Sequence, residues 1–247
     1  MAKVIASRDG LGIKQRYRKL FNKLSYVVCV VCSVLCIEFA CREMDLWLTV
    51  LMGVLSFFGT YTIQFTKDRI GQIQGGIEGE EAVLKCVKKL PDTYYCITNP
   101  VIQIEGRDNE LDLVVVGPNG VHIIEVKNWS GTVNGSYLDD VLHRKSRKGE
   151  ETTARNPIRQ VGRHTDTLSM YLSARGINPR VVRSMVFGAV FFYNKRASVN
   201  ITDIPPNGVR VFSVPNDGWN QLMQHLNREI AFPLTKNEIE KIVEALQ

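Results

Sequence analysis

Residues Glu110–Asn128, with the sequence ELDLVVVGPNGVHIIEVKN, determine the centre of the fold. Leu111–Val116 and Val121–Val126 are short runs rich in β-branched residues, and the turn-forming sequence Gly-Pro-Asn-Gly separates them at residues 117–120. This pattern predicts a β-hairpin. Both faces of each strand carry apolar residues, so we expect the hairpin to lie inside a sheet rather than at its edge.

Three polar residues interrupt this apolar hairpin, and their spacing brings them together. Glu125 and Lys127 share one face of a strand because side chains alternate along it. A turn centred on residues 118–119 sets Asp112 opposite Glu125, whereas a turn centred on 119–120 sets it opposite Lys127. Either register places two carboxylates and an amine on one face. Only a loop with an odd number of residues would place them on different faces.

Two carboxylates on a buried surface are costly unless they have partners or bind a cation. Asp112 and Glu125 together could form a binding site for a hard divalent cation such as Mg²⁺. Such a cation polarises a phosphate and lowers the pKa of a bound water. Lys127 beside it could orient that water or stabilise charge on the phosphate. The alternative is a solvated strand face with an incidental Glu-x-Lys pair.

The positive charge of the chain is concentrated near its N-terminus. The 247 residues carry a formal net charge of +6, and 45% of them are hydrophobic. The residues before Leu24 include a single acidic residue, Asp9, and several basic ones. Their net charge of +6 equals that of the whole chain. The basic character therefore belongs to this tail and says little about the rest of the chain.

Two apolar stretches follow the basic tail. Leu24–Cys41 and Leu46–Phe65 have about the length that spans a bilayer, and only residues 42–45 separate them. We therefore expect a two-helix transmembrane hairpin, with the lipid bilayer as a partner. Basic residues on both outer flanks predict a multi-pass protein of the cell membrane with both termini in the cytoplasm. A signal peptide is the rival interpretation, and Glu38 close to Cys41 argues against it.

Helices and strands are predicted on both sides of the central hairpin. Ile77–Leu90 reads as a helix that Pro91 stops. Glu80 lies in its apolar stripe, and we interpret it either as a site carboxylate or as a rim residue in the first turn. Asn156-Pro157 begins a helix that extends to about Arg175, with Gln160 one turn in. The other predicted elements are strands within 94–104, 132–142, 182–192 and 209–214, and helices at 218–230 and 235–246.

A basic stretch follows the hairpin and continues into the next helix. Such stretches contact phosphates but also occur as solvated loops. No aromatic residue interleaves with it, so base stacking on a single strand is not predicted. The candidate nucleic-acid-binding residues are Arg144, Lys145, Arg147, Lys148, Arg155, Arg159 and Arg163.

Other chemistries lack their sequence motifs. There is no P-loop, no dinucleotide-binding fingerprint and no nucleophile-elbow serine. The histidines are scattered and show no ligand spacing: His122, His143, His164 and His225.

The order helix, strand, hairpin, helix, strand, with Asp on one strand and Glu-x-Lys on the next, resembles the PD-(D/E)XK nuclease superfamily. It is most similar to the nuclease-related domain, NERD, over roughly residues 76–192. Leu111 stands where the superfamily name has Pro. The residues that carry the resemblance are Gly79-Glu80, Glu110-Leu111-Asp112, Gly117–Gly120, Glu125–Asn128, Gly131, Asn156-Pro157 and Gln160.

The resemblance implies an α/β fold. Its centre would be a restriction-endonuclease-like core, a mixed central sheet flanked by helices, in addition to the two-helix transmembrane hairpin. The expected divisions are a basic tail and membrane hairpin at 1–66, a linker at 67–75, the NERD nuclease-like domain at 76–195, and a C-terminal strand and helices packing on it at 196–247.

The resemblance also implies a site and an activity. Asp112, Glu125 and the carbonyl of Val126 would bind Mg²⁺ or Mn²⁺, and Lys127 would position the attacking water. The implied catalytic residues are Glu80, Asp112, Glu125, Lys127 and Gln160. We expect a membrane-anchored, metal-dependent nuclease that hydrolyses phosphodiester bonds of nucleic acid, DNA foremost, on the cytoplasmic side. The alternative is a non-catalytic nucleic-acid-binding or signalling module that retains the nuclease fold.

Overall fold

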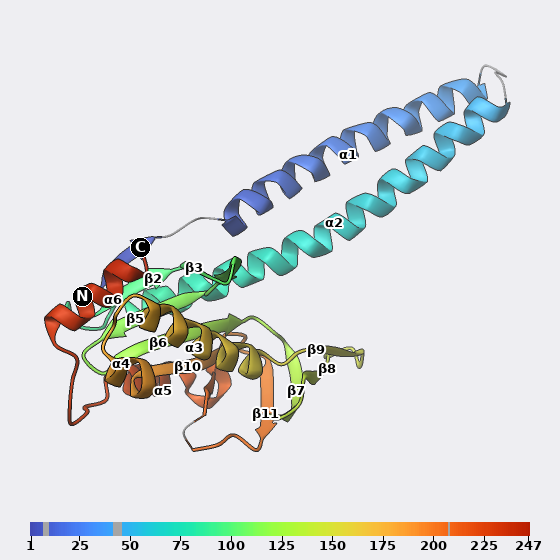
Figure 1. The fold of residues 1–247 in the computed structure, drawn as a ribbon. Coiled ribbons are helices and arrows are strands. Elements are labelled where there is room, and N and C mark those ends of the chain that lie inside the picture. The colour runs from blue at the N-terminus through green and yellow to red at the C-terminus, as the bar shows by residue number, and fades with distance from the viewer. Residues whose placement is uncertain (7–9, 42–45, 207) are drawn as a thin grey trace. The chain divides into compact units, whose positions relative to one another are not determined.

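The computed structural model describes the backbone of residues 1–6, 10–41, 46–206 and 208–247 (Figure 1). The chain divides into two compact units. One comprises Met1–Arg8 together with Glu78–Gln247, and the other comprises Asp9–Ile77. Residues 42–45, the expected turn between two membrane spans, lie outside the described residues.

Two long helices make up the unit Asp9–Ile77. Helix α1 covers Gly10–Cys41, and helix α2 covers Leu46–Val87, so its last turns belong to the other unit. The helices meet through small polar side chains, with the hydroxyls of Ser33 and Ser56 at 2.6 Å. Helix α2 runs without a break through residues 67–75, where glycines predicted a linker. An isolated glycine costs a helix only about 1 kcal/mol, which does not force a break.

The expected transmembrane hairpin is not supported. Within the described residues, no helix is both long enough and apolar enough to cross a membrane. This finding overturns the predicted multi-pass location in the cell membrane and removes the support for a lipid bilayer as partner.

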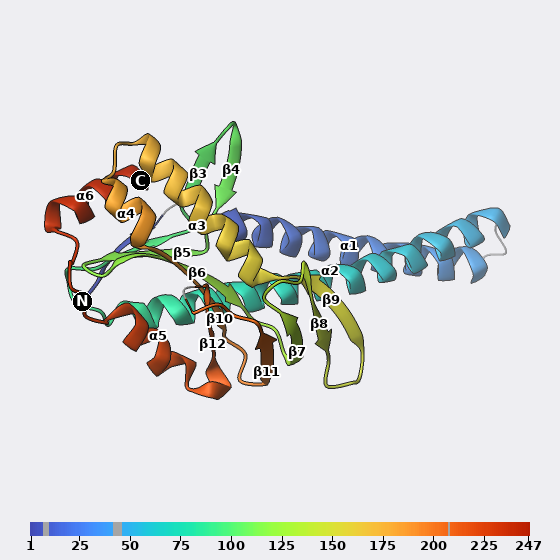
Figure 2. The same ribbon diagram turned by 60° about the horizontal axis from the view of Figure 1, so that its bottom comes forward.

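A mixed six-stranded sheet forms the centre of the unit that contains the C-terminus (Figure 2). The β2–β5 and β5–β6 pairs are antiparallel and the other pairs are parallel. Strands β5 and β6 lie in the middle, which confirms that the hairpin is central. In spatial order the strands are β1 (Lys3–Ala6), β2 (Tyr95–Thr98), β5 (Leu113–Gly117), β6 (Gly120–Lys127), β10 (Val186–Phe192) and β12 (Arg210–Ser213).

The central hairpin closes in the first of the two registers considered. Gly117 pairs with Gly120, so residues 118–119 form a two-residue turn. Gly120 has φ +127°, and a Cβ atom there would lie 2.5 Å from the carbonyl oxygen of Met185, so the position requires glycine. The pairing of Leu113 with Ile124, continued by one residue, sets Asp112 opposite Glu125.

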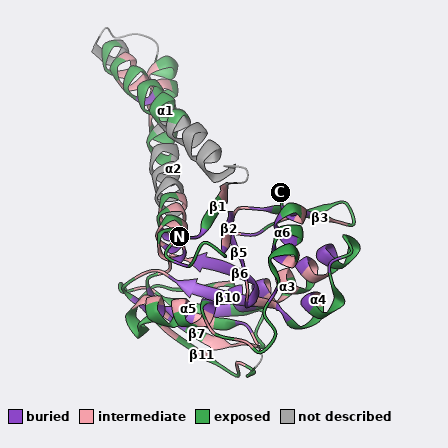
Figure 3. Ribbon diagram, turned by 90° about the vertical axis from the view of Figure 1, so that its left-hand side faces the viewer, coloured by how far each residue is buried: buried purple, intermediate pink, exposed green. Residues whose placement is uncertain are grey.

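Helices cover both faces of the central sheet. Val114, Val116 and Ile123 point into one buried cluster with α3 (Pro157–Ala174), α4 (Pro179–Ser184) and α6 (Lys236–Ala245). Leu113 and Ile124 point into another, with the end of α2 and α5 (Gly218–Leu226). The hairpin strands are accordingly buried on both faces, as Figure 3 shows.

Two smaller sheets complete the fold, and much of them was not predicted. One has the order β11-β7-β8-β9, with β7 (Gly131–Ser136), β8 (Val141–Lys145), β9 (Glu151–Arg155) and β11 (Ala197–Thr202). The other pairs β3 (Val101–Ile104) with β4 (Arg107–Glu110). A 3₁₀ turn at Val214–Asn216 precedes α5. The predicted basic stretch is therefore largely the β8–β9 hairpin, and the expected basic tail contains β1.

Local sequence signals explain where the helices begin and end. Asn156 caps α3 with Pro157 at its first position, as predicted, and Gly176 follows the helix with φ +72°. Thr235 and Glu238 form a capping box at the start of α6. The strand expected at 182–192 begins only at Val186, because Asn178 caps a short helix, α4, ahead of it.

Candidate active site

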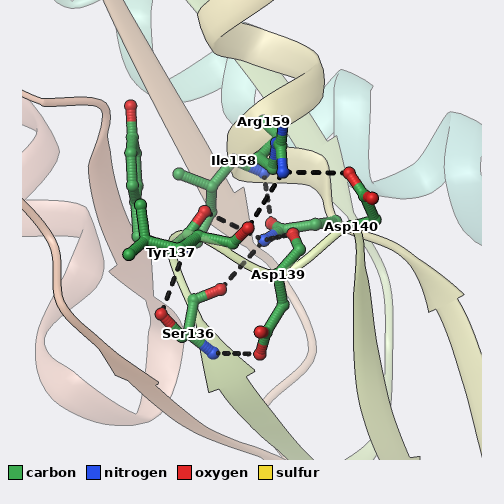
Figure 4. Close-up of polar contacts among 8 residues, drawn as sticks. Ser136, Tyr137, Asp139, Asp140, Ile158 and Arg159 are labelled. Atoms are coloured by element: carbon green, nitrogen blue, oxygen red, sulfur yellow. Dashed lines mark hydrogen bonds and ion pairs between the residues drawn. The ribbon is translucent and has the colours of Figure 1, made fainter.

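Helix α3 is fixed in place by its capping residue. The buried Asn156 side chain accepts a hydrogen bond from the Ile158 N–H at 3.0 Å. It also donates to the carbonyls of Ser136, Tyr137 and Asp139, at 3.1, 3.4 and 2.8 Å. Figure 4 shows these turn residues gathered around the start of the helix. The cap thus fixes the start of α3 to the turn between β7 and β8.

Glu125 lies at the centre of a polar cluster and is only 2% exposed. Its Oε1 atom accepts hydrogen bonds from Lys127 Nζ at 2.5 Å and from Gln160 Nε2 at 3.0 Å. Its Oε2 atom is buried and has no hydrogen-bond partner among the described residues. His164 Nδ1 lies 4.0 Å from Oε2 and is likewise buried without a partner. One carboxylate oxygen is therefore fully engaged, and the other is left open.

Asp112 adds a second carboxylate beside Glu125. Its Oδ2 atom accepts a hydrogen bond from the Val126 N–H at 2.9 Å, which holds it against strand β6. Burial, followed by the nearby negative charge of Glu125, raises the pKa of Asp112 to about 8. The negative charge of Glu125 is thus close enough to oppose the ionisation of Asp112.

Glu80 joins the cluster from the last turns of α2. Gly79 lets the helix approach the sheet closely, since a Cβ atom there would lie 3.1 Å from Val126 Cγ1. Burial, together with the negative charges of Glu110 and Glu125, raises the pKa of Glu80 to about 7. Of the two interpretations of Glu80, this environment favours a site carboxylate over a simple rim residue.

The structure brings the five predicted catalytic residues into one neighbourhood, but their roles stay predictions. Sequence reasoning missed two further members of this cluster. Glu110, at the end of β4, contributes negative charge that bears on Glu80. His164 follows Gln160 by four residues, so both lie on one face of α3. That i, i+4 spacing is a signal from which His164 could have been selected.

A divalent cation fits the residues present, although they do not form a ready-made cage. Across the part of the chain that the structure describes, no three His, Cys, Asp or Glu residues are arranged to hold a metal ion. However, Glu125 Oε2 is a buried anionic oxygen with no partner, and the raised pKa values of Asp112 and Glu80 partly reflect crowded negative charge. Oxygen ligands of this type suit Mg²⁺ or Mn²⁺.

The predicted basic residues are not equally available to a phosphate backbone. Lys145 pairs with Glu151 at 2.9 Å, and Arg159 pairs with Asp140 at 2.9 Å (Figure 4). Those two positive charges are partly offset. The four exposed basic side chains of the set with no ion pair among the described residues are Arg147, Lys148, Arg155 and Arg163.

Arg144 has a different environment from the rest of the basic set. Its guanidinium stacks on the ring of Trp129, 4.6 Å from the ring centroid. Burial lowers its pKa. Sequence order showed no aromatic residue among these basic residues, but β-sheet pairing brings Trp129 beside one of them. An aromatic ring therefore lies beside one of these basic residues, although none interleaves with them in the sequence.

Residues 75–192 match the family model of the nuclease-related domain, NERD. The match supports the resemblance seen in the sequence. It runs from the turn of α2 before Glu80 to the end of β10, and so encloses every residue of the polar cluster.

Two similar proteins are matched over only part of their length. An uncharacterized protein from Bacillus anthracis is 29% identical over 96 residues, which are 36% of this chain and 42% of the relative. A probable kinase, PglW, from Streptomyces coelicolor is 28% identical over 147 residues, 55% of this chain and 9% of the relative. The chain spans less than half the length of either. No solved structure matches.

Proposed function

We propose that the NERD region is a metal-dependent nuclease that hydrolyses phosphodiester bonds of nucleic acid, DNA foremost. One observation carries the proposal. Asp112 and Glu125 lie side by side on neighbouring strands, Lys127 contacts Glu125, and a buried carboxylate oxygen is left without a partner. The nuclease-related family match supports the same reading.

Each residue has a definite task in this proposal. Asp112, Glu125 and the Val126 carbonyl would hold Mg²⁺ or Mn²⁺. Bound there, the ion supplies Lewis acidity and a water of lowered pKa. Gln160 and Lys127 both donate to Glu125 Oε1, which holds the carboxylate in one orientation and leaves Oε2 open.

Positively charged side chains of the chain itself would neutralise negative charge on the phosphate that is attacked. The ammonium of Lys127 is partly exposed, with 22% of its side chain accessible, so a phosphate oxygen could reach it. Glu80, with a pKa of about 7, can hold or release a proton near neutral pH. Exposed basic residues on β9, α3 and the β8–β9 turn would contact the phosphate backbone of a longer substrate.

The ion pair between Lys127 and Glu125 supports a second function. In that reading, the ion pair closes the site, and the fold serves as a non-catalytic nucleic-acid-binding or signalling module. The intact carboxylate pair favours catalysis, since a binding module has no need of clustered acids facing a phosphate backbone.

Cleavage by the purified full chain separates the two functions. Labelled DNA and RNA are incubated with chelator-treated protein, and Mg²⁺ or Mn²⁺ is then added. We expect cleavage only with metal. Glu125→Gln should abolish it, whereas Glu240→Gln, which removes an exposed carboxylate paired with Lys236, should cleave as the unmodified chain does. Binding without metal-stimulated cleavage in the folded protein would establish the non-catalytic function instead.

A further inference from the structure

We propose that His164 is a ligand of the cation site beside Glu125 and biases it towards first-row transition ions, such as Mn²⁺, over Mg²⁺. The inference rests on the proposed metal-dependent function and goes beyond it, because it assigns a ligand and a preference among ions. It begins from the open Oε2 atom of Glu125 and from the Nδ1 atom of His164, to which the nuclease proposal gives no role.

The Nδ1 atom of His164 and the Oε2 atom of Glu125 face each other across 4.0 Å. Both are buried, and neither has a hydrogen-bond partner among the described residues. The separation is too long for a hydrogen bond between them. Buried polar atoms are almost always satisfied, so two such atoms only 4.0 Å apart indicate a partner that both could share.

The chemistry of the two atoms indicates which group could bind to both of them. A carboxylate oxygen offers lone pairs, and so does the Nδ1 atom of a neutral imidazole that carries its proton on Nε2. Nitrogen and carboxylate ligands lie about 2.0–2.2 Å from a divalent transition ion. An ion could therefore touch both atoms across the observed separation with little movement of either. A lone water molecule is the competing occupant.

The position of His164 is built into the fold rather than left to a mobile side chain. The Asn156 cap fixes the start of α3, and Gln160, one turn before His164, already bonds Glu125. Gly188 lies beneath the helix, and a Cβ atom there would be 2.4 Å from Val161 Cγ1, so α3 packs tightly against β10. Only 15% of the His164 side chain is accessible.

An imidazole ligand changes which ion the site prefers. Carboxylate, carbonyl and water ligands suit Mg²⁺, whereas imidazole nitrogen favours transition ions. With Asp112 and Glu125 alone, the site would not distinguish Mn²⁺ from Mg²⁺ strongly. Adding the nitrogen of His164 should strengthen Mn²⁺ binding selectively.

The test measures ion binding directly, so it does not depend on activity. Chelator-treated full chain is titrated with Mn²⁺ and with Mg²⁺ by calorimetry, and pulsed electron paramagnetic resonance of the Mn²⁺ complex detects a directly bound nitrogen. We compare the unmodified chain with His164→Ala, His164→Gln and the control His143→Ala, which removes an exposed histidine on β8. Melting curves identify variants that fail to fold, and His164→Gln keeps much of the side-chain volume if His164→Ala does not fold.

We expect a nitrogen signal in the unmodified chain and in His143→Ala, and none in the two His164 variants. Mn²⁺ affinity should fall roughly tenfold or more in those variants, since even outer-shell partners of metal ligands cost 10–100-fold, while Mg²⁺ affinity changes far less. Mn²⁺ binding without a nitrogen signal, unchanged in folded His164 variants, would overturn this inference, leave the nuclease proposal standing and identify water as the occupant. If the unmodified chain binds neither ion, the metal part of the proposed function fails with it.

Discussion

Strand β6 carries two sets of buried ionisable residues, and they differ in kind. Glu125 and Lys127 lie on one face, with Asp112 and His164 beside them. His122 lies on the opposite face of the same strand, 5.2 Å from the ring centroid of His225. The first set gathers carboxylates, whereas the second gathers imidazoles.

The second set ties the fold together. His122 Nε2 is 3.2 Å from Asn119 Oδ1, and the amide nitrogen of Asn119 donates to the carbonyl of Leu226 at 2.8 Å. The Tyr94 hydroxyl donates to the same carbonyl. These bonds join the hairpin turn to the end of α5. Burial lowers the pKa of His122 and lowers that of His225 to about 4, so both imidazoles are neutral near pH 7.

The difference indicates which of the two clusters is the better candidate for a functional site. The neutral imidazoles avoid the larger cost of burying a charge, although His122 Nδ1 and His225 Nε2 are buried without a hydrogen-bond partner among the described residues. In the other set, burial and the nearby negative charge of other carboxylates raise the pKa of Asp112 and of Glu80. An arrangement that costs stability without closing the fold is typical of a functional site. The predictions below test that contrast, beginning with the largest expected effect.

Asp112→Asn should give the largest effect, and the effect should have opposite signs in two measurements. The change removes an anionic metal ligand but nearly keeps the side-chain volume. Cleavage with Mg²⁺ should therefore fall beyond the roughly 10²–10³-fold that follows loss of a single charge-stabilising group. In chelator, nucleic acid should bind at least as tightly, since one repelling charge is gone.

The control for Asp112→Asn is Asp108→Asn on β4, an exposed carboxylate that accepts a hydrogen bond from Gln103. It should leave cleavage and Mg²⁺ binding unchanged. A purely structural Asp112 would show a different pattern, with thermal stability, binding and cleavage falling together. Unchanged Mg²⁺ affinity in folded Asp112→Asn would show that Asp112 is not a ligand.

Lys127→Ala should lower cleavage by roughly 10²–10³-fold while leaving the chain folded. Lys127 is partly exposed and makes an ion pair, so its contribution to packing is small. Lys236→Ala removes a lysine from an exposed pair with Glu240 and is the matched control. Steady-state cleavage rates and melting curves on both variants decide the matter. Normal turnover by Lys127→Ala would rule out a catalytic role for this lysine.

The sequence predicts the centre of this site because two local rules fix it. Alternating side chains and a two-residue turn put Asp112 opposite Glu125, and both are short-range features. The Asn156-Pro157 pair likewise marks the start of α3. The sequence therefore predicts features that depend on strand pairing within a short stretch or on a helix cap.

What the sequence did not predict depends on contacts between distant segments. Strand β1 has only four residues within a basic tail, and it forms because β2, some ninety residues later, pairs with it. Trp129 meets Arg144 only because β7 and β8 pair. In the sequence, His164 is one of several scattered histidines, and only the fold brings it beside Glu125. Periodicity carries no information about such partners.

Asn156→Ala should lower both stability and cleavage, and cleavage by less than in Lys127→Ala. Loss of a helix cap costs about 0.5–2 kcal/mol, and here the three donated hydrogen bonds to the β7–β8 turn are lost as well. Gln160 would then be held less firmly against Glu125. Thr235→Ala removes the cap of α6 and is the control for destabilisation alone. If both variants lose stability equally and both cleave normally, the cap does not position the site.

The smallest expected effect concerns the pH dependence of stability, and here the two clusters should act in opposite directions. Asp112 has a folded pKa of about 8, above the roughly 3.9 of an unfolded chain. Between these values the folded state holds a proton that the unfolded state has released, so stability falls as pH rises. His225 has a folded pKa of about 4, below the unfolded value of about 6.5. Between those values the unfolded state holds the extra proton, so stability falls as pH drops.

The two contributions oppose each other between about pH 4 and 6.5, and only the carboxylate contribution remains from there to about pH 8. Denaturant unfolding of the chelator-treated chain should therefore show stability declining from pH 6.5 to 8. Asp112→Asn should flatten that decline and leave the acid side unchanged. His225→Gln should flatten the acid side and leave the decline in place. If one variant altered both limbs, the two faces of β6 would be coupled in their titration, and the contrast between a catalytic and a structural cluster would not hold.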